Sequence, residues 1–402
     1  MGYTSYSFPP ETPLFPRAHV VQTYLESYAT HFNIMPLIRF GTTVLDAKWE
    51  STQWMVTLSD GERLAYDHLV VSNGHYHIPR IPDVPGLVDW LKHDKAFHSA
   101  WYRRPDFAVD KLLVVGGGPS GNDIAIEMCT AASVVVHAFT DPALATNMIN
   151  KPHNLIRRGR PVEFRANGQV IFEDGTVEDN IDRCILATGY KLHFPFFEGS
   201  SMIHNGMPPD IPPLIPGDLF NSTYHVFPLA KHLFPLQTHY PMSSVAFIGL
   251  YMQIAPFPIM EAQAHAIVRA FDDPSSLDPI TEAVDIITRS ENLKSAGAST
   301  PLAVAKAWIR FVGDEQWVYR DELYEFARGE SGTPPIKAAG WEKECYGLRD
   351  QMRAGWVALE KSGKAGEWLK GVGKNGVQEW VELMHRVADY AKESGLSTSA
   401  RL

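Results

Sequence analysis

A glycine-rich segment in the first third of the chain, Gly116 to Gly121, constrains the fold more than any other feature of the sequence. It follows the apolar run Lys111 to Val115 and precedes Asn122 to Ala131, in which apolar residues recur at helical spacing. A strand, a glycine turn and a helix in this order are typical of an α/β unit that binds a dinucleotide. A second apolar strand, Ser133 to Phe139, follows the helix and completes the unit.

Three glycines of this segment match the pattern G-x-G-x-x-G, namely Gly116, Gly118 and Gly121. Gly116 is expected to permit the tight turn, Gly118 to let a pyrophosphate approach the backbone, and Gly121 to let the helix pack closely on the strand. Ser120 lies near the helix start, where its hydroxyl is expected to cap the helix and contact phosphate. The predicted dinucleotide-binding residues here are Gly116, Gly117, Gly118, Pro119, Ser120, Gly121 and Asn122. The alternative is a tight turn in an α/β core that holds no ligand.

Composition narrows the class of protein. A chain of 402 residues with 45% hydrophobic residues is long enough for two or three domains. No stretch approaches about 18 consecutive apolar residues, and the first residues lack the basic and apolar regions of a signal peptide, so neither a membrane span nor secretion is expected. The net charge of -10 argues against a nucleic-acid partner. The three cysteines form no C-x-x-C pair and are expected to be reduced core residues of a cytoplasmic protein.

Periodicity predicts further elements on both sides of the glycine segment. Pro79, Pro82 and Pro85 indicate a stiff linker at which one domain ends. The elements expected elsewhere are a helix over 16–32, strands over 38–47, 54–58 and 67–72 that form an antiparallel meander leading into a buried strand, strands over 182–190 and 245–250, a helix over 259–271 and a mostly helical region over 303–393.

Several separate segments, in the same order along the chain, resemble the flavin-containing monooxygenase family. The glycine segment resembles the second, NADPH-binding fingerprint of that family. The other similar segments are Tyr6-Ser-Phe-Pro-Pro10, Tyr24-Leu-Glu-Ser-Tyr28, Val70-Val-Ser-Asn-Gly-His-Tyr76, Ala187-Thr-Gly-Tyr190, Phe194-Pro-Phe-Phe197, Tyr224-His-Val-Phe-Pro228 and Phe247-Ile-Gly-Leu250 with Gln253.

The resemblance implies an α/β flavoprotein with two dinucleotide-binding domains, in which an FAD domain is interrupted by an NADPH domain and a helical region follows. The expected limits are 1–87 for the remainder of the FAD domain, 88–240 for the NADPH domain, and 241–402 for the return to the FAD domain plus C-terminal helices. The implied cofactors are FAD and NADPH, and the implied reaction uses O2 to oxygenate a nitrogen or sulfur atom of a small metabolite. Further cofactor-binding residues implied by the resemblance are Asn73, Thr188, Gly189, Gly249 and Gln253. The alternative for Thr188 and Gly189 is a plain turn at a strand end, and the alternative for Asn73 with Gly74 is a tight turn.

The chain departs from the family pattern in three places. The family's FAD fingerprint and the segment with its catalytic asparagine would precede Met1, so the first Rossmann strand-turn-helix is expected to be absent and the catalytic residues are unassigned. Only one part of the family's identifying pattern is present here, namely His98-Ser-Ala-Trp-Tyr102. Asp141 follows the second strand where many members carry arginine, and Lys151, Arg157 and Arg158 are the candidates to supply that charge. The alternative is that Asp141 accepts a hydrogen bond from a ribose hydroxyl, which would favour NADH.

The missing first strand would leave its neighbour with unpaired backbone groups. An oligomer or a partner covering the gap is therefore one expectation, and a truncated or degenerate relative that binds nucleotide without catalysis is the alternative function. Ala400-Arg401-Leu402 resembles a peroxisomal targeting tripeptide, so a peroxisomal location is the alternative to the cytoplasm.

Overall fold

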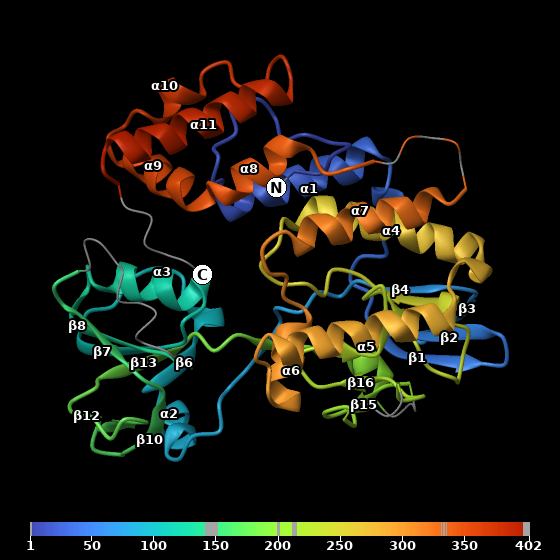
Figure 1. Ribbon diagram of the computed structural model, residues 1–402. Helices are drawn as coiled ribbons and strands as arrows, with labels where there is room; N and C mark the ends of the chain where they lie inside the picture. The colour runs from blue at the N-terminus through green and yellow to red at the C-terminus, as the bar shows by residue number, and fades with distance from the viewer. Residues whose placement is uncertain are drawn as a thin grey trace. The chain divides into compact units, whose positions relative to one another are not determined.

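The computed structural model of the protein describes residues 2–140, 152–198, 202–210, 215–330, 332, 334 and 336–396. Asp141, Lys151 and the C-terminal tripeptide therefore lie outside the described residues. The chain divides into two compact units (Figure 1). Unit 1 comprises Met1–His75, Leu192–Gly347 and Ser362–His385, and unit 2 comprises Tyr76–Lys191, Leu348–Lys361 and Arg386–Leu402. These limits differ from the expected ones at 87 and 240, and the assignment of a nucleotide to each unit remains a proposal.

Unit 2 is built on a five-stranded sheet with the strand order β6-β13-β7-β8-β9. Every neighbouring pair in this sheet is parallel. The strands are β6 (Ala96–His98), β13 (Arg183–Leu186), β7 (Val109–Val115), β8 (Ala132–Ala138) and β9 (Leu155–Arg158). The side chains of Leu112 to Val115 are at most 7% exposed, because helices and strands cover both faces of the sheet.

Successive side chains of β7 point to opposite faces of this sheet. Leu112 and Val114 pack in one cluster with Ile124 and Met128 of α3 (Pro119–Met128). On the opposite face, the core includes Leu113, Val115, part of α2 (Leu87–Lys92) and part of a small antiparallel sheet. The remaining elements of unit 2 are β10 (Pro161–Phe164), β11 (Val170–Phe172), β12 (Val177–Glu178), the pair β5 (Ile78–Pro79) and β14 (Tyr190–Lys191), the 3-10 turn Ser99–Trp101, and α9 (Arg349–Lys361).

Unit 1 combines an antiparallel meander with several two- and three-stranded sheets. The meander is β1 (Val44–Glu50), β2 (Gln53–Leu58) and β3 (Arg63–Tyr66). A separate parallel pair joins β4 (Leu69–Val71) to β20 (Val245–Phe247), strands far apart in the sequence. The shorter strands are β15 (His204–Asn205), β16 (Phe220–Asn221), β17 (Val226–Phe227), β18 (Leu229–Ala230) and β19 (Phe234–Pro235), and the 3-10 helices are Met35–Leu37, Pro195–Phe197, Met242–Ser244 and Pro274–Ser276.

Two helices of unit 1 begin at a capping residue followed by proline. Asp278 and Thr300 each precede a proline, and each side chain accepts hydrogen bonds from backbone N–H groups of the first helical turn. The core between α4 and α7 includes Ile259, Ala262 and Leu323. The helices are α1 (Ala18–His31), α4 (Pro256–Asp272), α5 (Pro279–Ser295), α6 (Pro301–Trp308), α7 (Glu315–Arg328), α8 (Gly340–Gly347), α10 (Ala365–Leu369) and α11 (Val377–Glu393), the last of which ends in unit 2.

Most expected elements are present, with shifts at their ends. The expected helices over 16–32 and 259–271 correspond to α1 and α4. The strand expected over 38–47 begins later, at Val44, because the chain turns at Phe40 and Gly41, where Gly41 has a φ of +66°. The third strand of the meander is β3, which the sequence analysis missed, and the segment expected there instead forms β4 and pairs with β20.

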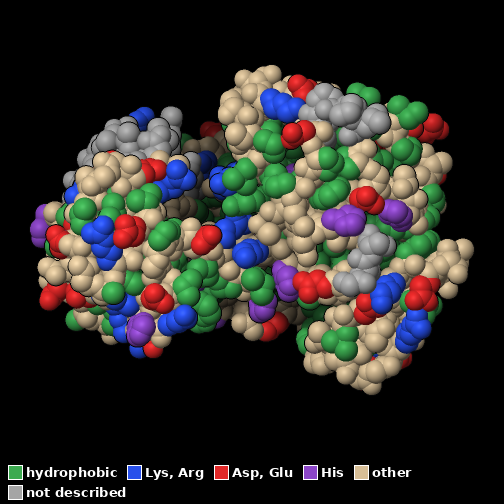
Figure 2. All heavy atoms as spheres, turned by 90° about the horizontal axis from the view of Figure 1, so that it is seen from below, with side chains coloured by type: hydrophobic (Ala, Val, Ile, Leu, Met, Phe, Trp, Pro, Cys, Tyr) green, Lys and Arg blue, Asp and Glu red, His purple; other side chains and the backbone are tan. Residues whose placement is uncertain are grey.

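Two surface properties bear on the class of protein. Among the described residues, no helix combines the length and the apolar character that crossing a bilayer demands. On the face drawn in Figure 2, basic and acidic side chains are interspersed.

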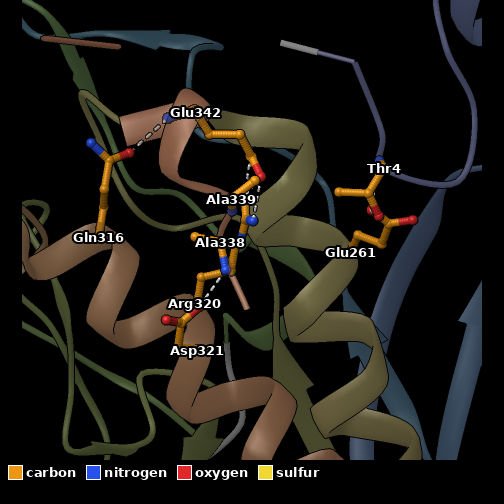
Figure 3. Close-up of polar contacts among 9 residues, drawn as sticks. Thr4, Glu261, Gln316, Arg320, Asp321, Ala338, Ala339 and Glu342 are labelled. Atoms are coloured by element: carbon orange, nitrogen blue, oxygen red, sulfur yellow. Dashed lines mark hydrogen bonds and ion pairs between the residues drawn. The ribbon is translucent and has the colours of Figure 1, made fainter. Parts of the chain in front are cut away.

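A buried ion pair joins α7 to α8 in unit 1. Arg320 is 1% exposed and donates to both carboxylate oxygens of Glu342, at 2.6 and 2.8 Å. Around it, the Gln316 side-chain oxygen accepts from the Ala255 N–H. The Asp321 carboxylate accepts from the Ala338 N–H, as Figure 3 shows. Burial acts to raise the pKa of Glu342, but its bonds from Arg320 and the Ala339 N–H outweigh burial and hold that pKa below 4.5.

Arg320→Met should lower the free energy of unfolding by about 3–5 kcal/mol, because it leaves the Glu342 carboxylate buried without its partner. Since the folded pKa of Glu342 lies below its ordinary value of 4.5, the stabilisation is present above that pH and is lost as the pH falls below it. Arg39→Met is the matched control, because its partner Glu62 is solvent-exposed and little change is expected. Urea unfolding at pH 7 measures both, and equal effects would contradict the account.

Candidate dinucleotide-binding site

The glycine segment lies at the carboxyl edge of the unit 2 sheet. It connects the end of β7 to α3, with Gly118 as the N-cap and Pro119 at the first helical position. From β7 the chain proceeds to β8 and β9 on one side, whereas β13 and β6 lie on the other. The order of the strands therefore reverses between β7 and β13, which is the position at which open α/β sheets bind ligands.

Two of the three pattern glycines have no room for a side chain. A Cβ atom on Gly116, whose φ is +128°, would lie 2.1 Å from the carbonyl oxygen of Ala187. A Cβ atom on Gly121 would lie 1.9 Å from the carbonyl oxygen of Gly116. A Cβ atom on Gly118 would have no neighbour within 4 Å. The loop is thus closed toward the sheet and open at Gly118, on the side from which a ligand would approach.

The loop also presents hydrogen-bond donors. Within the described ranges, the backbone N–H groups of Gly117 and Gly118 donate to no other group. The Asn122 side-chain amide donates to the Gly117 carbonyl at 3.0 Å and so fixes the peptide group between Gly117 and Gly118. Ser120 is exposed in the first turn of α3; the prediction that its hydroxyl caps the helix is wrong, because Gly118 is the N-cap and no side chain caps this helix. Free N–H groups at a helix N-terminus are a favourable site for phosphate oxygens.

Residues that follow β13 lie at the same edge of the sheet. Ala187 donates its N–H to the Val115 carbonyl at 2.8 Å, directly before the glycine loop. Thr188 donates its hydroxyl to the Arg80 carbonyl, and Gly189 has a φ of +79°. The structure therefore brings the predicted residues Thr188 and Gly189 close to the glycine segment, since their strands are neighbours.

Two buried histidines donate hydrogen bonds to backbone carbonyls at this edge of the sheet. The sequence did not predict these contacts. His98 is fully buried and donates from Nε2 to the Gly189 carbonyl at 3.0 Å. His137 is also fully buried and donates from Nε2 to the Gly116 carbonyl at 2.8 Å. Burial lowers the pKa of both, that of His137 to about 4. The available signal was a polar residue inside an otherwise apolar strand.

Arg157 and Arg158, the described candidates to supply a positive charge to a bound nucleotide, both make contacts within unit 2. Arg157 donates to Nδ1 of His137 at 3.2 Å, and its guanidinium lies 5.1 Å from the ring centre of Phe139. Arg158 forms a 2.5 Å ion pair with Glu178. Their part in recognising a nucleotide stays a prediction.

The other predicted site residues belong to unit 1. Asn73 and Gly249 follow β4 and β20, and because these strands are paired in parallel, both lie at the same edge. The Asn73 amide donates to the His193 carbonyl at 3.1 Å, and the Gly249 N–H donates to Gln263 at 3.0 Å. Gln253 has a φ of +60°, and its carbonyl accepts from the Tyr346 hydroxyl.

Comparison with known sequences identifies relatives over most of the chain. A family model described as flavin-binding monooxygenase-like matches residues 1–164 and 154–317. Thiol-specific monooxygenase of Saccharomyces cerevisiae is 31% identical over 284 residues, which are 67% of this chain and 62% of that protein. Flavin-containing monooxygenase FMO GS-OX-like 2 of Arabidopsis thaliana is 30% identical over 381 residues, 89% of this chain and 75% of that protein. The chain thus spans less than two thirds of the yeast relative.

Solved structures of two other proteins share the fold of this chain. S-allyl-L-cysteine S-oxygenase from Allium sativum superimposes with a TM-score of 0.68 at 22% identity, over 98% of this chain and 82% of that chain. Tmm from Pelagibacter sp. strain HTCC7211 gives 0.62 at 21% identity, over 88% and 73%. The predicted fold class, an α/β flavoprotein with two dinucleotide-binding domains and a helical C-terminal region, is confirmed. The predicted absence of a first strand-turn-helix stays a prediction.

The cofactors of this family are FAD and NADPH, as predicted, and the two units fit them unequally. In unit 2 the glycine loop is open at Gly118 and has free N–H groups, which are the features that a phosphate-binding loop needs. In the described part of unit 1, the parallel pair β4 and β20 is not followed by a loop with this glycine spacing. The glycine loop of unit 2 therefore fits a dinucleotide diphosphate such as that of NADPH, and the described residues of unit 1 show no second loop of this kind after β4 or β20.

Alanine substitutions should separate the packing glycines from the open one. Gly121→Ala should lower the free energy of unfolding by about 1–3 kcal/mol, because the new Cβ would collide with the Gly116 carbonyl oxygen. Gly118→Ala should change it by less than about 1 kcal/mol, since Gly118 has a φ of -74° and open space around it. Denaturant unfolding of the ligand-free protein measures both, and equal losses of stability would show that the loop is packed differently.

Proposed function

The chain belongs to the flavin-binding monooxygenase-like family, and from this premise we propose that it binds NADPH in unit 2 and serves a flavin-dependent monooxygenase reaction. In this reaction NADPH, a proton, O2 and a small substrate give NADP+, water and a substrate that carries one more oxygen atom on sulfur or nitrogen. The observation that carries the proposal is the shape of the glycine loop, which is closed at Gly116 and Gly121 and open at Gly118.

Unit 2 would hold the diphosphate of the dinucleotide through backbone groups. The N–H groups of Gly117 and Gly118 and the first turn of α3 would donate to the phosphate oxygens, with Ser120 beside them. Thr188 and Gly189, at the end of the neighbouring strand β13, would lie beside the nicotinamide half. These residues bind and orient the dinucleotide, and the hydride and oxygen chemistry belongs to the cofactors.

In unit 1, the residues proposed to line the flavin are Asn73, Gly249 and Gln253. Asn73 and Gly249 support this proposal by lying together at one edge of the β4 and β20 pair. Bound flavin would supply the capacity to accept a hydride and to activate O2. Because unit 1 has no diphosphate cradle within its described residues, no step is assigned to a flavin held by this chain alone.

The relatives favour sulfur as the oxygenated atom. The yeast relative is named a thiol-specific monooxygenase and shares 31% identity over 67% of this chain. We therefore propose a small thiol or thioether as the first substrate class to test, with amines second. The second candidate function is a relative that binds nucleotide without catalysis, for which the glycine loop of unit 2 alone would be sufficient.

Experiments on the purified 402-residue chain should distinguish the two functions. A catalytic protein is expected to carry or take up FAD, to absorb near 450 nm, and to oxidise NADPH faster when cysteamine or a methyl thioether is added. NADH and trimethylamine are the matched comparisons for the dinucleotide and for the substrate atom. Colourless protein that binds NADPH but does not oxidise it in the presence of added FAD would establish the second function instead.

Gly118→Val should abolish NADPH binding under either function, because the branched side chain would occupy the open side of the loop. Gly366→Val in α10 is the control, since that glycine also has open space around it and lies in unit 1. Isothermal titration calorimetry should show at least a hundredfold weaker binding for the first variant and unchanged binding for the second. Unchanged affinity of Gly118→Val would remove the site assignment.

A further inference from the structure

The carbonyl of Gly116 is held from two sides inside unit 2. Its oxygen lies against Gly121, where a Cβ atom would approach to 1.9 Å, so no side chain fits between them. The same oxygen accepts a hydrogen bond from Nε2 of His137 at 2.8 Å. It therefore points into the core, toward β8 and away from the open side of the loop.

The direction of this carbonyl determines the direction of a ligand-facing donor. Because the peptide bond is planar and trans, the Gly116 carbonyl and the Gly117 N–H point in opposite directions. With the carbonyl turned inward, the Gly117 N–H is turned outward, where it has no partner among the described residues. Rotation of this peptide group would direct a carbonyl oxygen at the phosphates, which would repel them.

His137 is itself fixed in the state that can donate. Arg157 donates to its Nδ1 at 3.2 Å, and this bond requires Nδ1 to be unprotonated and places the single proton on Nε2. The side chain is fully buried, and burial holds its pKa at about 4, so the imidazole is neutral at neutral pH. Arg157 in turn lies over the ring of Phe139, which packs against Gly117 with 3.1 Å between the Phe139 side chain and the ideal Cβ position.

We propose that His137 and Arg157 are positioning residues that fix the Gly116–Gly117 peptide group, so that the glycine loop presents the Gly117 N–H to a dinucleotide diphosphate before any ligand binds. The inference rests on the proposed function of unit 2. In this arrangement the Arg157 guanidinium donates to Nδ1 of His137 and thereby keeps the imidazole proton on Nε2. Preorganisation of this kind raises affinity because the ligand does not have to order the loop.

Three variants test the role of the pair in NADPH binding. His137→Leu removes the donor and should raise the Kd for NADPH about tenfold, which corresponds to about 1.4 kcal/mol. His137→Gln can place an amide donor near the position of Nε2 and should restore the Kd to within about threefold of the wild type. Arg157→Met should weaken NADPH binding less than His137→Leu does. Without Arg157 the imidazole proton can move to Nδ1, but Nε2 of His137 can still donate in a fraction of the molecules.

Rescue by glutamine separates positioning from general stability. The denaturant midpoint of unfolding of each ligand-free variant is measured alongside its Kd for NADPH. If His137 only stabilised the fold, the increase in Kd would parallel the loss of stability in both His137 variants. Wild-type affinity in a folded His137→Leu variant, or equal weakening by leucine and glutamine, would overturn the inference.

A measurement without nucleotide keeps the inference separate from the proposed function. In the ligand-free protein, the imidazole 15N shifts of His137 at pH 7 should report a neutral ring protonated at Nε2, and Arg157→Met should introduce the other tautomer. A charged ring or a proton on Nδ1 in the wild type would overturn the inference whether or not NADPH binds. Absence of any binding of NADPH or NADH to wild-type protein with the expected His137 shifts would overturn the proposed function alone.

Discussion

The contact between backbone groups at the carboxyl edge of the unit 2 sheet is the constraint on which the candidate site depends. Gly116 lies so close to Ala187, and Gly121 so close to Gly116, that neither glycine can carry a side chain. This contact brings β7, β13 and α3 to one point and leaves Gly118 as the open position. The site is therefore a product of packing between main-chain atoms, and the side chains around it serve to keep that packing in place.

The two units contribute differently to the family's function. Unit 2 has a complete sheet with both faces covered and a loop that suits a diphosphate. Unit 1 has a parallel pair, β4 and β20, whose following residues Asn73 and Gly249 lie together, but its described residues lack a glycine loop of that type. Nucleotide binding is thus supported by the structure of one unit, whereas monooxygenase activity depends on how a flavin is held.

The sequence predicted the glycine loop well because that loop depends on local features. An apolar run, closely spaced glycines and a helical repeat lie within about 25 residues, and each has a direct backbone consequence. The strand β3 was missed because Arg63 to Tyr66 is short and mostly exposed, so it carries little hydrophobic signal. The contacts of His98 and His137 with Gly189 and Gly116 could not be predicted either, since they join strands through registers that only the folded sheet defines.

If the glycine loop of unit 2 binds a dinucleotide through its backbone amides, these amides should respond to the ligand. Titration of 15N-labelled protein with NADP+, followed by amide NMR, measures that response residue by residue. We expect saturable shifts that are largest for the N–H groups of Gly117 and Gly118 and for the first turn of α3. Shifts confined to other parts of the chain, with these resonances unchanged at saturation, would contradict this mode of binding.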